Sequence, residues 1–201
     1  MSIIPRPASN FNNDLYALIK QSEGFEKKVY SDTEGVPTIG IGYALLEKIQ
    51  GEWRVRGYID EQLQSAGINI QQSDRQTLQS VADALNSNNV AQARSLIQSS
   101  TFSFSLSNET QGRQLFDYII PNYKAEVRQK IGDTLYQQLD GSKEMIALVS
   151  LAYNNPSLIG AKLIAALQSG DRDEAWHEIR YNSNNGGSRC KGLANRRYRE
   201  S

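Results

Sequence analysis

The 201-residue chain is poor in the side chains that most metal sites and nucleophilic active sites use. It has one cysteine, Cys190, and one histidine, His177. A single cysteine excludes an intramolecular disulfide framework and a thiolate metal cluster, and a single histidine excludes a multi-histidine metal site. No nucleophile motif such as G-x-S-x-G accompanies His177, so we interpret it as a helix-surface residue and Cys190 as a bystander. We therefore expect neither a metal nor a cofactor.

Net charge and long apolar runs are also missing. The chain carries 22 basic and 22 acidic residues, which argues against nucleic acid as its main partner. No apolar run approaches the roughly 18 residues that span a bilayer. The first residues, MSIIPRPASNFNND, lack the apolar stretch of a secretory signal. We expect a monomer, made in the cytoplasm, that inserts in no membrane; a substrate outside the cytoplasm requires another component to deliver the protein.

Helical periodicity dominates the sequence, and β-forming residues gather in one stretch. Residues 13–22 predict a helix that Gly24 ends, residues 29–43 predict turns and strands, and residues 101–106 are a weaker strand candidate. Further helices are predicted at 60–66, 73–87, 89–99, 108–119, 121–139, 142–153, 158–169, 171–181 and 191–200, with N-caps at Ser73, Ser107, Ser142 and Asp171. The helix at 142–153 is apolar nearly all round, which is typical of the centre of a bundle.

These elements predict a single domain of the α+β class, mainly α, built as two lobes. We expect an N-terminal lobe over about 12–105, which holds the β region 29–43 as a small hairpin sheet together with a helical insertion. Residues from about 106 to 201 are expected to form a helical lobe. A groove between two lobes is where a substrate site is expected.

Two acids and a threonine stand out in residues 22–43, SEGFEKKVYSDTEGVPTIGIGY. Glu23 falls at the end of a predicted helix, where the helix dipole disfavours a second negative charge, as suits a general acid. Asp32 falls in a polar turn that keeps a carboxylate ionised, and Thr38 follows on the return strand, where it is placed to hold a water. Two carboxyls in contrasting surroundings suit glycoside hydrolysis. The same residues also suit the solvated surface of an ordinary hairpin, and the chemistry alone leaves both readings open.

Residues 23–42, EGFEKKVYSDTEGVPTIGIG, resemble the catalytic segment of the phage-type lysozymes, glycoside hydrolase family 24. The shared pattern is Glu-Gly at a helix end, a Tyr-x-Asp turn and Gly-x-x-Thr-Ile-Gly-x-Gly, with the two acids and the threonine spaced by nine and then six residues. The resemblance implies a lysozyme-like fold with a catalytic cleft between two lobes. It also implies that Glu23 is the general acid, that Asp32 with Thr38 positions the attacking water, and that the anomeric carbon is inverted.

The second half of the chain carries further similarity. Residues 145–154 resemble the family's central buried helix, residues 163–172 the helix pair after it, and residues 192–200 its terminal Gly-Leu-x-x-Arg-Arg-x-x-Glu motif. The segment 44–105 is longer than the corresponding part of the family pattern. We expect it to contain two extra helices, whose simplest role is packing. Tyr43 stands where many members carry histidine. Arg197 is suited equally to a buried structural ion pair and to substrate binding. The predicted substrate contacts are Gly40, Gly42, Tyr43, Asn154, Asn155 and Arg197.

The implied activity is that of a lysozyme, an N-acetylmuramidase that cuts the β-1,4 bond between N-acetylmuramic acid and N-acetylglucosamine in peptidoglycan glycan strands. The implied biology is a phage endolysin that acts on murein in the periplasm. The same chemistry suits an antibacterial lysozyme effector or a virion lysozyme. A lytic transglycosylase is a competing hypothesis, against which Asp32 and Thr38 argue. A catalytically silent murein-binding protein is another, against which the presence of all three residues argues.

Overall fold

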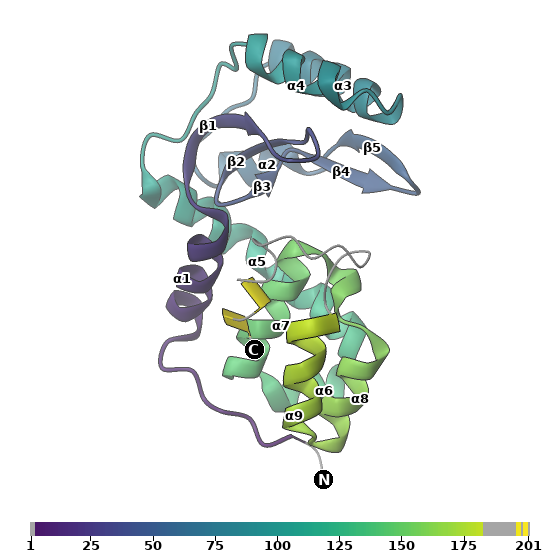
Figure 1. The fold of residues 1–201 in the computed structure, drawn as a ribbon. Coiled ribbons are helices and arrows are strands. Elements are labelled where there is room, and N and C mark those ends of the chain that lie inside the picture. Colours follow the sequence, from purple (N-terminus) through teal and green to yellow (C-terminus); the bar gives the residue numbers. More distant parts are fainter. Residues whose placement is uncertain (1–2, 183–195, 198, 201) are drawn as a thin grey trace. The chain divides into compact units, whose positions relative to one another are not determined.

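The computed structural model describes residues 3–182, 196–197 and 199–200 (Figure 1). The chain folds into two compact units. The helical unit combines Met1–Ser22 with Ile120–Ser201, and the mixed unit is the continuous segment Glu23–Ile119. These bounds differ from the predicted lobes, because nearly all of the first helix belongs to the helical unit and the mixed unit continues past residue 105. A helical content of 61% and a small antiparallel sheet in the N-terminal region confirm the predicted α+β class.

The mixed unit begins with a three-stranded antiparallel sheet in the predicted β region. Its strands are β1 (Glu26–Ser31), β2 (Pro37–Gly40) and β3 (Tyr43–Ala44), in the order β1-β2-β3. Tyr30 pairs with Thr38, and β2 is buried along its whole length. The turn between β2 and β3 is tight, because Gly40 and Gly42 both have the positive φ that glycine adopts without strain.

A second hairpin, β4 (Leu46–Ile49) with β5 (Glu52–Val55), follows where no strand was predicted. Gln50 and Gly51 form its two-residue turn, and both have a positive φ, as such turns require. The weaker strand candidate at 101–106 is wrong, because that segment is irregular. It lies beside β1 through a hydrogen bond from the N–H of Leu106 to the carbonyl of Lys27 at 2.8 Å.

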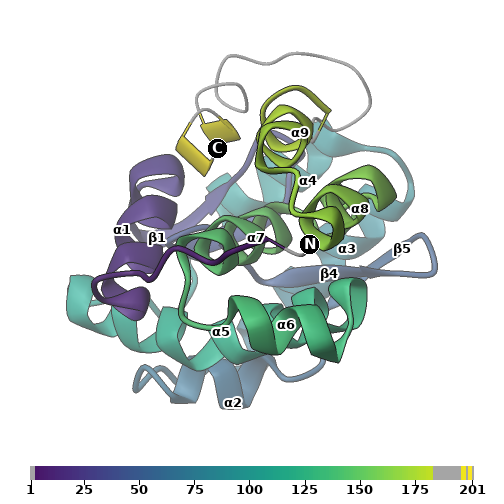
Figure 2. The same ribbon diagram turned by 90° about the horizontal axis from the view of Figure 1, so that it is seen from below.

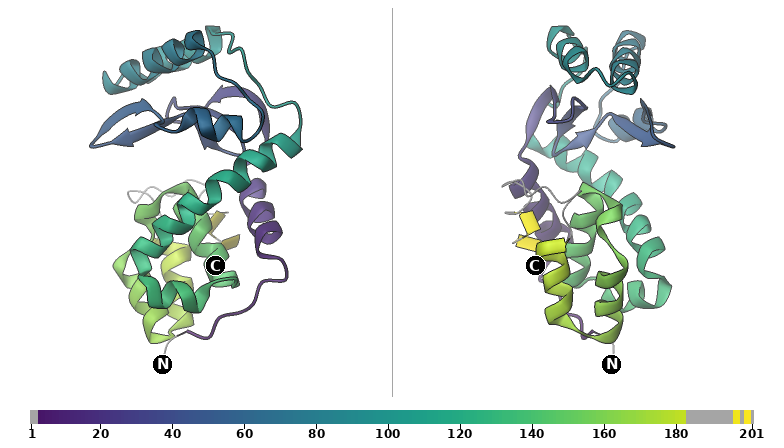
Figure 3. Two further views of the ribbon diagram at one scale, coloured as in Figure 1. Left: turned by 180° about the vertical axis from the view of Figure 1, so that it is seen from behind. Right: turned by 45° about the vertical axis from the view of Figure 1, so that its right-hand side comes forward.

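Three helices of the mixed unit lie close to predicted ones: α2 (Ile59–Gln64), α3 (Gln72–Asn86) and α4 (Val90–Ser99). Because α3 packs against β5 and α4 against β1, the helix pair lies along one face of the strands (Figure 3). Leu78, Val81 and Leu85 of α3 are buried in this core. The capping box of α3 joins Gln71 to Asp74, so the predicted cap at Ser73 is wrong by two residues.

The centre of the helical unit is α7 (Lys143–Asn154), which the other helices surround (Figures 1 and 2). Its residues from Met145 to Tyr153 are buried without a gap, as the apolar sequence predicted. Ser142 caps it as predicted, by accepting a hydrogen bond from the N–H of Met145 at 3.1 Å. The surrounding elements are α1 (Phe11–Glu23), the second half of α5 (Glu109–Ile131), α6 (Asp133–Leu139), a 3-10 turn (Pro156–Leu158), α8 (Ala161–Ser169), α9 (Arg172–His177) and a π turn (Glu178–Asn182).

The long helix α5 (Glu109–Ile131) joins the predicted helix 108–119 to the first part of the predicted helix 121–139, whose last part is α6. The predicted break at Pro121 is wrong, since the helix continues through this residue and ends at Gly132, whose φ is 81°. Asn108 rather than Ser107 makes the capping bond, by accepting from the N–H of Gln111 at 3.1 Å. The boundary between the two units falls inside α5, between residues 119 and 120.

The end of the chain agrees with the prediction as far as it is described. Asp171 caps α9 by accepting from the N–H of Glu174 at 2.9 Å, and the predicted helix 171–181 divides into α9 and the π turn. Of the predicted helix 191–200, residues 196–197 and 199–200 are described and are helical, and Cys190 lies outside the described residues. Among the described helices, none has both the length and the apolar composition needed to cross a membrane.

Candidate active site

Glu23 is the last residue of α1, and its carboxyl rests against Gly42. Gly24, with a φ of 76°, ends the helix directly after it. A Cβ atom added to Gly42 would lie 3.0 Å from Oε2 of Glu23, so the missing side chain makes room for this carboxyl. Glu23 is half-buried there. The structure therefore places the predicted general acid beside the turn between β2 and β3, inside the mixed unit.

Asp32 follows β1 in a tight turn that fixes its carboxylate. Its Oδ1 accepts hydrogen bonds from the backbone N–H groups of Glu34 at 2.9 Å and Val36 at 2.7 Å. Its own N–H donates to the carbonyl of Val36 at 3.0 Å. These local bonds hold one carboxylate oxygen and orient the other. An oriented, half-buried carboxylate is what a residue that directs a water requires.

Thr38 lies in β2 opposite Tyr30 and is almost fully buried. Its hydroxyl donates to the carbonyl of Val36 at 3.1 Å. Because this bond uses the only proton of the hydroxyl, Thr38 presents lone pairs to any further partner. Val36 thus joins the two predicted residues: its N–H binds Asp32 and its carbonyl binds Thr38.

Tyr30, on β1, belongs to the same group; it is the tyrosine of the Tyr-x-Asp pattern, for which no role was predicted. Burial, and then the charges of Glu23, Asp32 and Glu26, raise the pKa of its phenol to about 12. Since both predicted catalytic acids act on the phenol, it lies within electrostatic reach of both. Its position two residues before Asp32, in the Tyr-x-Asp pattern, is the signal by which the sequence could have revealed it.

The two glycines are covered by side chains of their own unit. Gly40 is buried, and a Cβ atom added there would lie 3.1 Å from Cδ1 of Leu106. The corresponding space at Gly42 holds the carboxyl of Glu23. Both glycines therefore make room for a side chain of their own unit, Leu106 or Glu23, and their predicted contact with a glycan stays a prediction.

Tyr43 is a core residue of the mixed unit. It is 2% exposed, and its hydroxyl donates to the side-chain carbonyl of Gln62. The guanidinium of Arg56 lies 5.2 Å from the centre of its ring, within the range of a cation–π contact. The ring is thus enclosed by its own unit, which corrects the predicted substrate contact.

The other predicted contacts, Asn154, Asn155 and Arg197, belong to the helical unit. Arg197 is fully buried and donates to the carboxylate of Glu200 and, at 2.7 Å, to Oδ1 of Asn154. Asn155 caps the 3-10 turn by accepting from the N–H of Ser157 at 2.9 Å. Of the two roles that the sequence left open for Arg197, buried pairing is the one that the structure shows.

Glu200 anchors this buried cluster to the central helix. Its Oε1 accepts from the hydroxyl of Ser150 at 2.5 Å and from Nε of Arg196 at 2.9 Å. Arg196 also donates to the carbonyl of Ser150 at 2.7 Å. Because buried charges are stable only when they are paired and hydrogen-bonded, these contacts are structural.

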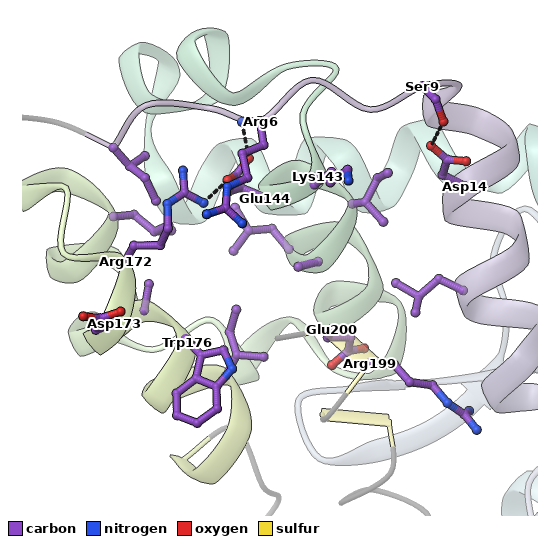
Figure 4. A pocket seen from close by; sticks show the side chains of 18 residues that line it. Arg6, Ser9, Asp14, Lys143, Glu144, Arg172, Asp173, Trp176, Arg199 and Glu200 are labelled. Carbon is purple, nitrogen blue, oxygen red and sulfur yellow. Dashed lines mark hydrogen bonds and ion pairs between the residues drawn. The ribbon is translucent and has the colours of Figure 1, made fainter.

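The helical unit also contains a cavity of about 860 Å³, and none of the predicted catalytic residues lines it (Figure 4). At one end Glu144 accepts from the N–H of Arg6 at 2.9 Å and pairs with Arg172. Burial raises the pKa of Glu144, but these bonds outweigh it and hold the pKa below its ordinary value. Trp176 lies on another side of the cavity (Figure 4).

Three potential metal ligands gather in the described part of the helical unit, at Glu174, His177 and Glu178. Their ligand atoms lie within 4.8 Å of one another, but Glu174 and His177 are exposed, and such groups are common on protein surfaces without an ion. His177 lies 5.1 Å from the ring of Tyr181. The histidine thus takes the helix-surface position that was predicted for it.

The comparison with known families agrees with the fold. The family model for phage lysozyme matches residues 95–200, which is more than half of the chain. The chain belongs to the phage lysozyme family. It is therefore a lysozyme-type hydrolase whose substrate is peptidoglycan.

The match covers the helical unit better than the candidate site. It includes Asn154, Asn155 and Arg197 but begins after the segment 23–43. The catalytic roles of Glu23, Asp32 and Thr38 therefore stay predictions. No curated protein matches the sequence.

Proposed function

We propose that the protein is an N-acetylmuramidase that hydrolyses the β-1,4 bond between N-acetylmuramic acid and N-acetylglucosamine. The supporting observation is that Glu23 and Asp32 both act on the phenol of Tyr30 from contrasting places in one unit. Glu23 ends a helix and rests on a glycine, whereas Asp32 lies in a turn that supplies two backbone donors. Two carboxyls in different surroundings suit the separate tasks of protonating a leaving oxygen and activating a water.

In the proposed reaction Glu23 gives its proton to the glycosidic oxygen as the bond to the anomeric carbon breaks. Asp32 accepts one proton of the attacking water. Thr38 accepts a hydrogen bond from the other proton, because its own proton is bound to Val36. The water attacks from the face opposite the leaving group, which inverts the anomeric carbon. The reaction uses no metal and no cofactor.

Turbidity measurements on purified murein test the two acids. Glu23→Gln keeps the shape of the side chain but has no acidic proton, so we expect a loss of at least about 100-fold in the clearing rate. Asp32→Asn keeps an oxygen that accepts from Glu34 and Val36, so its melting temperature is expected to stay near that of the wild type while its clearing rate falls by a similar factor. If Glu23→Gln clears murein as fast as the wild type, the muramidase proposal is wrong.

Product analysis separates hydrolysis from transglycosylation. Digestion in ¹⁸O-labelled water is expected to place the label on a reducing N-acetylmuramic acid end. An unlabelled 1,6-anhydro product would show that no water enters, and would remove the proposed role of Asp32 and Thr38.

We also propose that the enzyme is a monomeric phage endolysin, made in the bacterial cytoplasm and acting on periplasmic murein without binding nucleic acid. The family and the balanced charge support this. When the protein is expressed in a Gram-negative bacterium, lysis is expected only after the inner membrane is permeabilised, and light scattering is expected to give the mass of one chain. Lysis without permeabilisation would contradict the proposal that the enzyme stays in the cytoplasm until the inner membrane opens. Neighbouring genes for secretion or virion assembly would favour an effector or a virion lysozyme.

A further inference from the structure

The strand register places two polar side chains on one side of the β1–β2 ladder, and Asp32 follows directly after β1. Tyr30 and Thr38 are directly opposite each other, and side chains of such a pair point to the same face. Asp32 comes two residues after Tyr30, in the turn that joins β1 to β2. The phenol therefore stands on the side of the ladder that carries Thr38, and the charges of Glu23 and Asp32 both act on it.

The Tyr30 hydroxyl has free hydrogen-bonding capacity. It makes no hydrogen bond within the described part of the chain, where every fully buried side-chain nitrogen or oxygen has a partner. A half-buried hydroxyl without a protein partner must then reach solvent, where a ligand can meet it. Burial and then the neighbouring acids raise its pKa to about 12 and keep it neutral, so it stays a donor at every pH at which such an enzyme works.

The three proposed catalytic residues are themselves poor donors to a bound sugar. An ionised Asp32 only accepts, and the proton of Thr38 is bound to the carbonyl of Val36. The proton of Glu23 is reserved for the glycosidic oxygen in the proposed reaction. A sugar between the two carboxyls can give its hydroxyl protons to these acceptors, but its own acceptor oxygens need a donor, and the phenol of Tyr30 is placed to supply it.

We propose that Tyr30 contacts the substrate, and that its phenol donates a hydrogen bond to an oxygen of the sugar bound between Glu23 and Asp32. This inference rests on the proposed muramidase function. The bond holds the sugar in place while the acids act, and its loss weakens the complex.

The test is Tyr30→Phe, which removes one oxygen and keeps the ring. Since the lost hydroxyl has no protein partner in the described chain, we expect an unchanged melting temperature. We expect kcat/KM on a soluble murein oligosaccharide to fall about tenfold, the value of one hydrogen bond of ordinary strength. The pH dependence of kcat/KM is expected to keep both limbs, because the phenol is neutral throughout. The matched control is Tyr58→Phe, at a tyrosine of the same unit that is 71% exposed, and it is expected to leave every parameter unchanged.

The outcomes distinguish this inference from the function on which it rests. If Glu23→Gln is inactive while Tyr30→Phe equals the wild type, the function stands and the substrate contact is wrong. A melting temperature that falls together with activity would show a structural role for Tyr30, and a shifted pH limb would show that it acts through the acids; either result overturns the proposed contact. If Glu23→Gln is as active as the wild type, the muramidase function itself fails.

Discussion

The carboxyl of Glu23 occupies the space that a side chain at position 42 would need. Gly42 has a φ of 78°, and a Cβ atom there would meet the Glu23 side chain at 3.0–3.2 Å. A methyl group would therefore cost backbone strain and would also displace the carboxyl. Gly51 has a similar φ of 90°, but a Cβ atom added to it meets nothing within 4 Å.

This difference gives a matched pair of substitutions. Gly42→Ala and Gly51→Ala are each expected to lower the free energy of unfolding by about 1 kcal/mol, because each forces alanine into the left-handed region. Gly42→Ala alone is expected to lower the murein-clearing rate, by about tenfold or more, since it alone moves Glu23. Urea unfolding and a turbidity assay measure the two effects. Equal activity in the two variants would show that the position of Glu23 against Gly42 has no part in catalysis.

Individual residues could be predicted where their setting is local. The place of Glu23 at a helix end and of Asp32 in a turn follow from neighbours a few positions away, and both agree with the structure. The buried setting of Tyr43 and Arg197 does not follow from nearby sequence. It depends on Gln62 and Arg56 in one case and on Asn154 and Glu200 in the other.

At the scale of elements, the unpredicted hairpin β4–β5 is held to α3 by two hydrogen bonds from Asn86, which we call the clamp. Asn86, the last residue of α3, accepts from the N–H of Trp53 at 2.7 Å and donates to its carbonyl at 2.9 Å. The amide thereby satisfies both backbone groups of a residue in β5, as a further strand would do. The hairpin was hard to predict because its strands alternate only weakly between buried and exposed residues, and because its partner lies 33 residues away.

Removing the clamp tests this account. Asn86→Ala is expected to lower the free energy of unfolding by about 1–2 kcal/mol, the value of two hydrogen bonds in a partly solvated place. Hydrogen exchange of the Trp53 amide is expected to become faster. The control is Asn122→Ala, at an exposed position of α5, where alanine is the better helix former and no loss is expected. Unchanged exchange at Trp53 would contradict the clamp.

At the scale of the whole molecule, the first described residues belong to the fold of the helical unit. The N–H of Ile3 donates to the carbonyl of Leu167 at 3.2 Å, and the N–H of Ala8 to that of Gly141 at 3.0 Å. Glu144 then joins Arg6 of this segment to Arg172 of α9. This proline-containing segment is thus hydrogen-bonded to Glu144 of α7 and, through Glu144, linked to Arg172 of α9.

The link through Glu144 makes stability depend on pH. Its pKa in the folded protein lies below its ordinary value of 4.5, so the folded state favours the ionised form. The stabilisation is therefore fully present above about 4.5 and is lost as the pH falls through the lowered folded pKa. At pH 7, Glu144→Gln is expected to lower the free energy of unfolding by about 1–3 kcal/mol, the value of hydrogen bonds to a charged group. Below the folded pKa the wild type and the variant are expected to converge.

Thermal unfolding of both proteins between pH 7 and pH 3 measures this convergence. Asp173→Asn is a suitable control, because Asp173 also lines the cavity but is exposed. A difference between wild type and Glu144→Gln that stays constant down to pH 3 would show that the charge of Glu144 does not contribute to stability.

The sequence by itself determined most of the helices, the caps at Ser142 and Asp171, the first β region and the spacing of Glu23, Asp32 and Thr38. These features depend on residues that are near one another in the chain. Only the tertiary structure decided that Gly42 makes room for Glu23, that Tyr30 stands within reach of both acids, that Asn86 clamps β5 and that Arg197 is buried. Each of these depends on the packing of segments that are apart in the chain, and no local pattern records it.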